Sequence, residues 1–194
     1  MRRLFKSFFF GIVLGFLPIA SFAQDVHAQQ ILRIVDFEDA ETSQNTGVWL
    51  HNILDSEQGL KMEISQEKDG SKKILRLDYD VDSPNPAMVG FWVNLRNQDL
   101  REFDTLHVSL KAGGVERFPG NIAFQFTDAD SHKAAYLVSS IPMEWKQFEV
   151  PLKNFNRIHD WSQIKEFEII IDDINARPKE GVLLVDEIYV SKDR

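Results

Sequence analysis

The sequence predicts an all-β fold, a β-sandwich of the jelly-roll type in which two antiparallel sheets face each other. About ten short segments alternate between apolar and polar residues, as strands with one buried face do. Turn-forming runs such as Asp69-Gly70 and Ser83-Pro84-Asn85-Pro86 separate them. No segment sustains a helical period, although 99–103 and 161–165 each fit a single turn. Many short strands without a long helix are typical of a sandwich.

The strands follow from these alternations in chain order. Met62 and Ile64 alternate with polar neighbours, and the turn at Asp69-Gly70 predicts a hairpin with the next strand. Further along, Phe124 and Phe126 point inward by the same rule. The final fifty residues predict three strands, against which the upstream strands pack. The expected strands cover 31–37, 48–54, 61–66, 74–80, 87–95, 105–111, 122–127, 133–139, 145–152, 164–172 and 183–190.

The N-terminus predicts an exported protein. A basic start, an apolar run from Phe8 to Leu17 and the small-residue site Ser21-Phe22-Ala23 are typical of a signal peptide over residues 1–23. A second plausible cleavage point follows Ala28, and an uncleaved N-terminal anchor is the alternative. Residues 24–30 are expected to be a flexible lead-in, and 31–194 a single domain. We therefore expect a periplasmic or secreted protein that is not inserted in the membrane after signal removal.

Composition excludes several classes of function. The chain has 22 basic and 30 acidic residues, and removal of Arg2, Arg3 and Lys6 with the signal leaves 19 against 30, a net charge of −11. Nucleic acids and anionic membranes bind basic surfaces, so neither is an expected partner. The absence of cysteine excludes disulfides, zinc–thiolate sites and thiol catalysis.

Four stretches carry a resemblance to a known fold family. They are Val35-Asp-Phe-Glu38, Trp145-Lys-Gln-Phe-Glu-Val-Pro-Leu-Lys-Asn-Phe155, Ile164-Lys-Glu-Phe-Glu-Ile-Ile-Ile171 and Leu184-Val-Asp-Glu-Ile-Tyr-Val190. Across nearly the whole mature chain, this pattern resembles the galactose-binding-like jelly rolls, and among them carbohydrate-binding modules of the family 11 type. A second family with a similar layout is the complex I intermediate-associated protein of thirty kilodaltons. The first resemblance implies saccharide binding, and the second implies an assembly factor.

Two acidic clusters, one near each end of the mature chain, predict a metal site. In a jelly roll the first and last strands lie side by side, so Asp36, Glu38 and Asp39 could meet Asp186 and Glu187 and offer oxygens to calcium. Modules of the resembled type often hold a structural calcium in this region. The resemblance assigns Glu38 and Asp186 to it, with Asp36 as a third ligand. The alternative is that these side chains are solvated or cap turns.

Polar and aromatic side chains on the outward positions of the central strands predict a shallow ligand platform. The outward residues are Arg76, Asp78, Trp92, Asn94, His107, Ser109, Gln125, Tyr136, Glu168 and Asp172. Sugars stack their C–H faces on rings and need paired donors and acceptors for their hydroxyls. The candidates for stacking are Trp92 and Tyr136, and those for hydrogen bonding are Arg76, Asp78, His107 and Gln125. The alternative is a solvated sheet face without a ligand.

Catalysis has little support. Glu168 and Asp172 would lie roughly 13 Å apart on one strand, too far for a glycosidase pair. The five histidines lack the spacing of a shared metal site on one strand or helical turn. The sequence thus predicts a secreted, non-catalytic protein that binds a polysaccharide or oligosaccharide, with a structural calcium. An envelope structural or assembly factor that binds another protein is the alternative.

Overall fold

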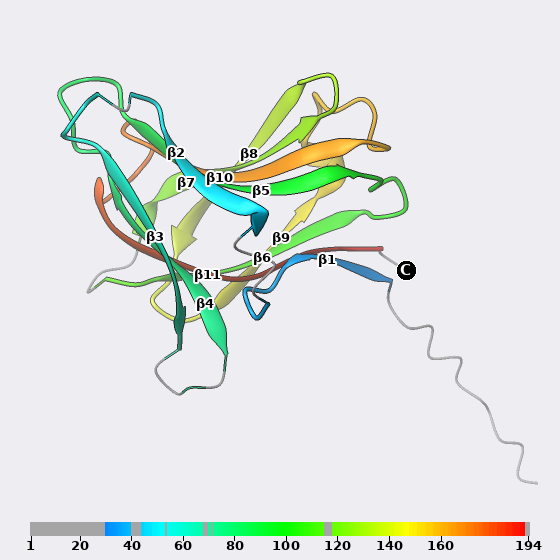
Figure 1. The fold of residues 1–194 in the computed structure, drawn as a ribbon, viewed down its shortest axis with the longest axis horizontal. Coiled ribbons are helices and arrows are strands. Elements are labelled where there is room, and N and C mark those ends of the chain that lie inside the picture. Colours follow the sequence, from blue (N-terminus) through cyan, green and yellow to red (C-terminus); the bar gives the residue numbers. More distant parts are fainter. Residues whose placement is uncertain are drawn as a thin grey trace, which may run out of the picture.

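The computed structural model describes residues 30–39, 44–52, 54–67, 70, 72–114 and 118–192 (Figure 1). The predicted signal peptide and the lead-in up to residue 29 lie outside the described residues. Within them, no helix is long and apolar enough to cross a membrane. The elements are β1 (Ile31–Val35), β2 (Thr46–Leu50), β3 (Gly59–Gln66), β4 (Lys73–Asp80), β5 (Met88–Gln98), β6 (Thr105–Ala112), β7 (Phe118–Asp128), β8 (Lys133–Ile141), β9 (Lys146–Pro151), the 3-10 turn η2 (Leu152–Asn154), β10 (Ile164–Asp172) and β11 (Glu180–Ser191).

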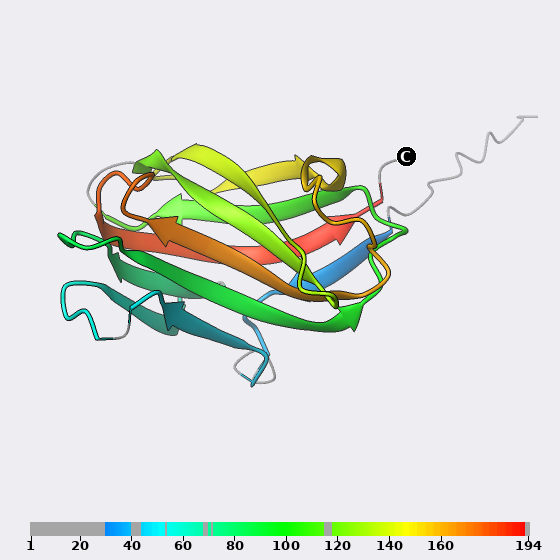
Figure 2. The ribbon, with the colours of Figure 1, turned by 90° about the horizontal axis from the view of Figure 1, so that it is seen from above.

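The strands form two antiparallel sheets that pack face to face, which confirms the predicted all-β sandwich. One sheet has the order β3-β4-β11-β6-β9, and β1 pairs with β11 as its sixth strand. The other has five strands in the order β2-β5-β10-β7-β8. Figure 2 looks onto the five-stranded sheet, with the six-stranded sheet behind it. The predicted hairpin between 61–66 and 74–80 is the β3–β4 pair.

Alternating apolar residues of the two sheets make the core. Phe91 on β5, Phe124 and Phe126 on β7 and Phe167 on β10 are fully buried between the sheets. Burial of each such ring contributes about 1.5–3 kcal/mol relative to an exposed one. These rings therefore hold a domain that has no disulfide.

Two predicted strand boundaries are wrong in ways that matter for the site. The first strand ends at Val35, because Phe37 adopts a φ of 62° and turns its ring into the core. The second strand covers Thr46–Leu50 rather than 48–54, and it pairs with β5 along its whole length. This earlier start brings Gly47 into the sheet, opposite Trp92.

Candidate functional site

The outer face of the five-stranded sheet carries the residues that we consider the candidate site. Phe91, Phe167 and Phe124 point into the core, so their neighbours in sequence point outward. One outward row runs across the five strands as Gly47, Trp92, Glu168, Gln125 and Ala135. The next row is Trp49, Gly90, Ile170, Ala123 and Leu137.

Two tryptophans lie flat on this face, each above a glycine of the neighbouring strand. In the β2–β5 pair, Trp92 is opposite Gly47 and Trp49 is opposite Gly90. A Cβ added at Gly47 would come within 2.6 Å of the Trp92 indole, and one added at Gly90 within 2.4 Å of the Trp49 indole. Only glycine leaves room for rings this close to the backbone, as in other cross-strand aromatic–glycine pairs.

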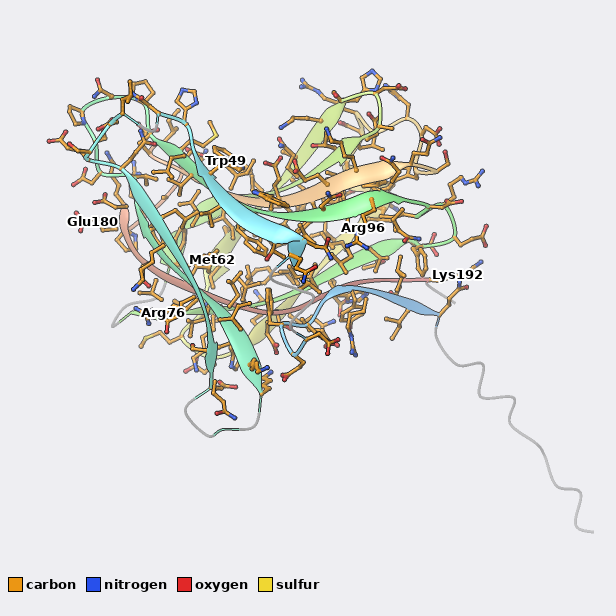
Figure 3. The ribbon with its side chains drawn as sticks, in the orientation of Figure 1. Trp49, Met62, Arg76, Arg96, Glu180 and Lys192 are labelled. Atoms are coloured by element: carbon orange, nitrogen blue, oxygen red, sulfur yellow. The ribbon has the colours of Figure 1, made fainter. Side chains whose placement is uncertain are left out.

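We call the two indoles the indole platform. Both tryptophans are half-buried, so each ring rests one face on the sheet while part of it stays accessible. Trp49 lies on β2, at the edge of the five-stranded sheet (Figure 3). A pair of rings spread over two strands provides a wide apolar surface.

A buried carboxylate adjoins the indole platform. Glu168 is only 3% exposed, although it is on the outer side of β10. Its Oε1 accepts a hydrogen bond of 2.8 Å from Trp49 Nε1, and its Oε2 accepts one from Gln125 Nε2. The Lys133 ammonium lies 3.4 Å from the same Oε2. A buried carboxylate is tolerated when it is hydrogen-bonded and paired in this way.

Glu168 therefore orients the indole of Trp49 and the amide of Gln125. It also influences Glu166, two residues earlier on the same outer face. Burial and the nearby charge of Glu168 raise the pKa of Glu166 above its usual value. The acidic pair is balanced in part by Lys133, so this face does not suit a strongly anionic ligand.

The predicted site residues do not share one surface, so the prediction of a single platform is wrong. Trp92 and Gln125 lie on the outer face of the five-stranded sheet. Arg76 and Asp78 lie on β4 and His107 lies on β6, both strands of the six-stranded sheet, which is the other layer of the sandwich. Figure 3 labels Arg76 on that sheet and Trp49 on the five-stranded sheet. Period-two alternation tells inward from outward but not which sheet a strand joins.

Tyr136 points inward rather than outward. It is opposite Phe124 in the β7–β8 pair and packs against Phe155, with ring centroids 6.2 Å apart. Residues opposite each other in a sheet share a face, and Phe124 is fully buried. The ring of Tyr136 therefore belongs to the edge of the core.

The three predicted ligands on the six-stranded sheet are engaged with neighbouring side chains. Arg76 forms a two-pronged ion pair with Asp78, with Nε to Oδ2 at 2.9 Å. His107 stacks on Tyr189 with ring centroids 4.4 Å apart. Its Nδ1 accepts a hydrogen bond from Gln147 Nε2, and its Nε2 lies 2.7 Å from the Ser191 hydroxyl. Their proposed role in binding has no test in this structure and stays a prediction.

The two acidic clusters do meet, because β1 pairs with β11, but basic residues lie between them. Arg33 contacts Asp36 at 2.8 Å and Glu187 at 3.1 Å. Asp186 is paired with the Lys72 ammonium. Burial disfavours the charge on Lys72, yet the hydrogen bond and charge of Asp186 outweigh it and raise the lysine pKa.

Glu38 also has a protein partner, since its Oε1 accepts a hydrogen bond of 2.8 Å from the backbone N–H of Lys73. Among the residues that the structure describes, no three acidic or histidine side chains are placed to hold one metal ion. Asp36, Glu38 and Asp186 thus do not offer calcium its usual set of free oxygens. The calcium expectation stays an untested prediction.

Trp49, Glu168 and Lys133 complete the site, and the sequence prediction did not assign a ligand role to any of them. From the sequence, Glu168 is considered as an outward residue and as half of a rejected catalytic pair with Asp172, and Trp49 is placed in a strand without a role. Their association depends on the order of strands in the sheet, which local patterns do not encode.

The fold matches that of known carbohydrate-binding modules. No protein-family model matches the chain, and no curated protein sequence matches it significantly. Among solved structures, the family 11 carbohydrate-binding module of a cellulosomal cellulase from Clostridium thermocellum is 14% identical, with a TM-score of 0.62, and the match covers 86% of this chain and 95% of that one. The CBM22-1 xylan-binding domain from Paenibacillus barcinonensis is also 14% identical, with a TM-score of 0.51, and the match covers 86% of this chain and 98% of that one.

The same fold also occurs as one part of larger enzymes. An exo-β-agarase is 12% identical with a TM-score of 0.61, and the match covers 84% of this chain but only 26% of the enzyme. These low identities show the fold alone, which is the jelly roll that the first resemblance implied. No finding bears on the resemblance to the complex I intermediate-associated protein, which stays a prediction.

Proposed function

We propose that this chain is a secreted, non-catalytic protein that binds a neutral saccharide chain on the outer face of its five-stranded sheet. The observation that carries the proposal is the indole platform beside Glu168. Trp49 and Trp92 supply the flat apolar surface on which sugar rings stack, and Gln125, Glu166 and Lys133 supply donors and acceptors for hydroxyls.

The charge of the face supports a neutral ligand. Glu166, Glu168 and Asp172 all lie on the outer side of β10, and Lys133 is the basic residue paired with Glu168. An acidic face repels anionic polymers such as polyuronates. The family 11 module solved with a β-1,3-1,4-mixed-linked tetrasaccharide makes that neutral oligosaccharide a natural first probe.

The contacts of Glu168 argue against glycoside cleavage on this face. Hydrolysis needs one carboxyl group to donate a proton and another to act as base or nucleophile. The oxygens of Glu168 already accept hydrogen bonds from Trp49, Gln125 and Lys133, so they are occupied by protein donors and not free to act on a substrate. Glu166 alone does not make a catalytic pair.

The test is a titration of the mature protein with the mixed-linked tetrasaccharide, with xylan and mannan oligosaccharides in parallel, for wild type and single-alanine variants. We expect Trp49→Ala and Trp92→Ala each to weaken binding about tenfold or more, which corresponds to about 1.4 kcal/mol. The matched control is Trp145→Ala. That indole also donates to a glutamate, at 2.6 Å to Glu67, but it is next to β9 of the other sheet.

Equal losses in all three variants would contradict the proposal, because they would indicate general destabilisation. A folded wild type that binds no glycan on a broad array would also contradict it. That result would favour the alternative of an envelope factor that binds another protein, which pull-downs from envelope extracts would then test.

A further inference from the structure

A cavity of about 700 Å³ lies at one end of the sandwich, away from the indole platform. Three chain segments line it: the β5–β6 connection at 100–104, the end of β9 with η2 at 151–153, and the loop at 159–161. Its size falls in the range of small-molecule sites in proteins.

Backbone hydrogen bonds fix these segments to one another. Leu100 N–H donates to the Trp161 carbonyl at 2.8 Å, and Leu152 N–H donates to the Asp104 carbonyl at 2.7 Å. The Asp104 N–H donates in turn to the carbonyl of Ser191 near the end of β11. The cavity is thus built by the fold and is not an accident of one loop.

The apolar part of the lining is aromatic. Trp161 and Phe103 are both half-buried and both line the cavity. The Trp161 indole is held edge-to-face against Phe126 and Phe155, with centroids 5.3 Å and 6.3 Å away. A ring fixed in this way presents an ordered apolar surface at low entropic cost.

The polar part of the lining combines both signs of charge. Arg101 and Lys153 are exposed on the cavity wall, and Asp104 and Asp160 oppose them. The Arg101 guanidinium is oriented by Asp99, with Nη2 to Oδ2 at 2.6 Å. The two basic residues of the lining, Arg101 and Lys153, are thus matched in number by the two acidic ones, Asp104 and Asp160. Such a lining suits a neutral ligand whose hydroxyls both donate and accept hydrogen bonds.

We propose that this end cavity is a second saccharide site, which takes one neutral sugar residue or the end of a chain. The choice of sugars rests on the proposed function, whereas the cavity does not. Its position at the end of the sandwich suits a terminal residue, while the open sheet face suits a continuous chain. Two sites on one chain would let it link two saccharide chains or gain avidity on one.

The test follows the four indole N–H signals of the full mature chain by nitrogen–proton NMR. The probes are D-glucose, D-mannose, D-xylose and D-galactose, followed by the mixed-linked tetrasaccharide. Trp161→Phe identifies the Trp161 signal. We expect that signal to shift on titration in wild type and equally in the double variant W49A/W92A, which lacks the indole platform.

The double variant R101A/K153A should weaken the Trp161 response at least fivefold and leave the Trp49 and Trp92 responses unchanged. Both side chains are exposed, so the fold is expected to survive their loss. The control K61A/K179A removes the same charge outside the cavity lining and should change nothing.

The outcomes separate the two proposals. A Trp161 shift without platform shifts supports the end site and contradicts the proposed function. Shifts of the Trp49 and Trp92 signals without a Trp161 shift support the proposed function and contradict the end site. If no indole signal shifts, both proposals are contradicted. A Trp161 response that R101A/K153A leaves at full strength also overturns the end site, because it would arise from an indirect effect.

Discussion

The contact between Gly90 and the Trp49 indole allows a sharp prediction, because one methyl group should displace the ring without changing it. In Gly90→Ala the new Cβ would lie 2.4 Å from Trp49 Cε2. Carbon atoms pack at about 3.5–4.0 Å, so the indole must move outward by about 1 Å or more. The 2.8 Å bond from Trp49 Nε1 to Glu168 would then exceed hydrogen-bond range.

The expected change in the free energy of unfolding of Gly90→Ala combines two opposing effects. Overpacking a fitted site costs about 1–3 kcal/mol. Replacing a strand glycine by alanine stabilises the folded state by about 0.5–1 kcal/mol, because alanine loses less backbone entropy on folding. A net loss of about 1–2 kcal/mol should lower the melting temperature by about 2–8 °C for a domain of this size. Because the ring leaves its place on the platform, affinity for the mixed-linked tetrasaccharide should fall about tenfold.

The assay is a thermal melt with a matched saccharide titration, and Gly59→Ala is its control. Gly59 is on β3 of the other sheet, and a Cβ there meets nothing within 4 Å. That variant should melt at or slightly above the wild-type temperature and bind normally. If Gly90→Ala behaved like Gly59→Ala in both measurements, the ring would not rest on Gly90 and the platform argument would fail.

Three further predictions concern charged groups. Glu168→Ala should lower the free energy of unfolding by about 1–3 kcal/mol, since it leaves the half-buried donors of Trp49 and Gln125 without an acceptor. Glu168→Gln should lower it less, and equal effects of the two variants in urea titrations would count against a hydrogen-bonding role. A chelator should leave the melting temperature unchanged, because Lys72 pairs with Asp186, and a clear drop would instead establish a bound cation. The pKa of Glu166 is raised, so the stability linked to its protonated form is present below its ordinary pKa of 4.5 and is lost as pH rises through the folded-state value. Glu166→Gln should therefore raise the melting temperature in neutral buffer and leave it unchanged well below pH 4.5; a shift of equal size at both would refute the linkage.

The sequence allowed the fold to be predicted because alternation and turns are local signals. Apart from shifted strand ends, as in β1 and β2, the predicted strands are present in the structure, and so are the β3–β4 hairpin and the pairing of the first and last strands. Which strands share a sheet is a long-range property, and this is why Arg76 and Trp92 were assigned to one surface although they lie on opposite sheets. The ion pair of Asp186 shows the same limit, since the lysine that pairs with it is 114 residues away in the chain.

One signal for the indole platform was nevertheless present in the sequence. The tripeptides Gly47-Val48-Trp49 and Gly90-Phe91-Trp92 have the same Gly-x-Trp form. When two such strands pair antiparallel with glycine opposite tryptophan, both tryptophans point to the same face and each finds an empty position beside it. If β2 slipped by one residue against β5, Trp49 would lie opposite Phe91 on the core side while Trp92 stayed on the outer face, so the repeat also constrains the register. The glycines are therefore as much a part of the site as the rings, which is why a single methyl group at Gly90 can test it.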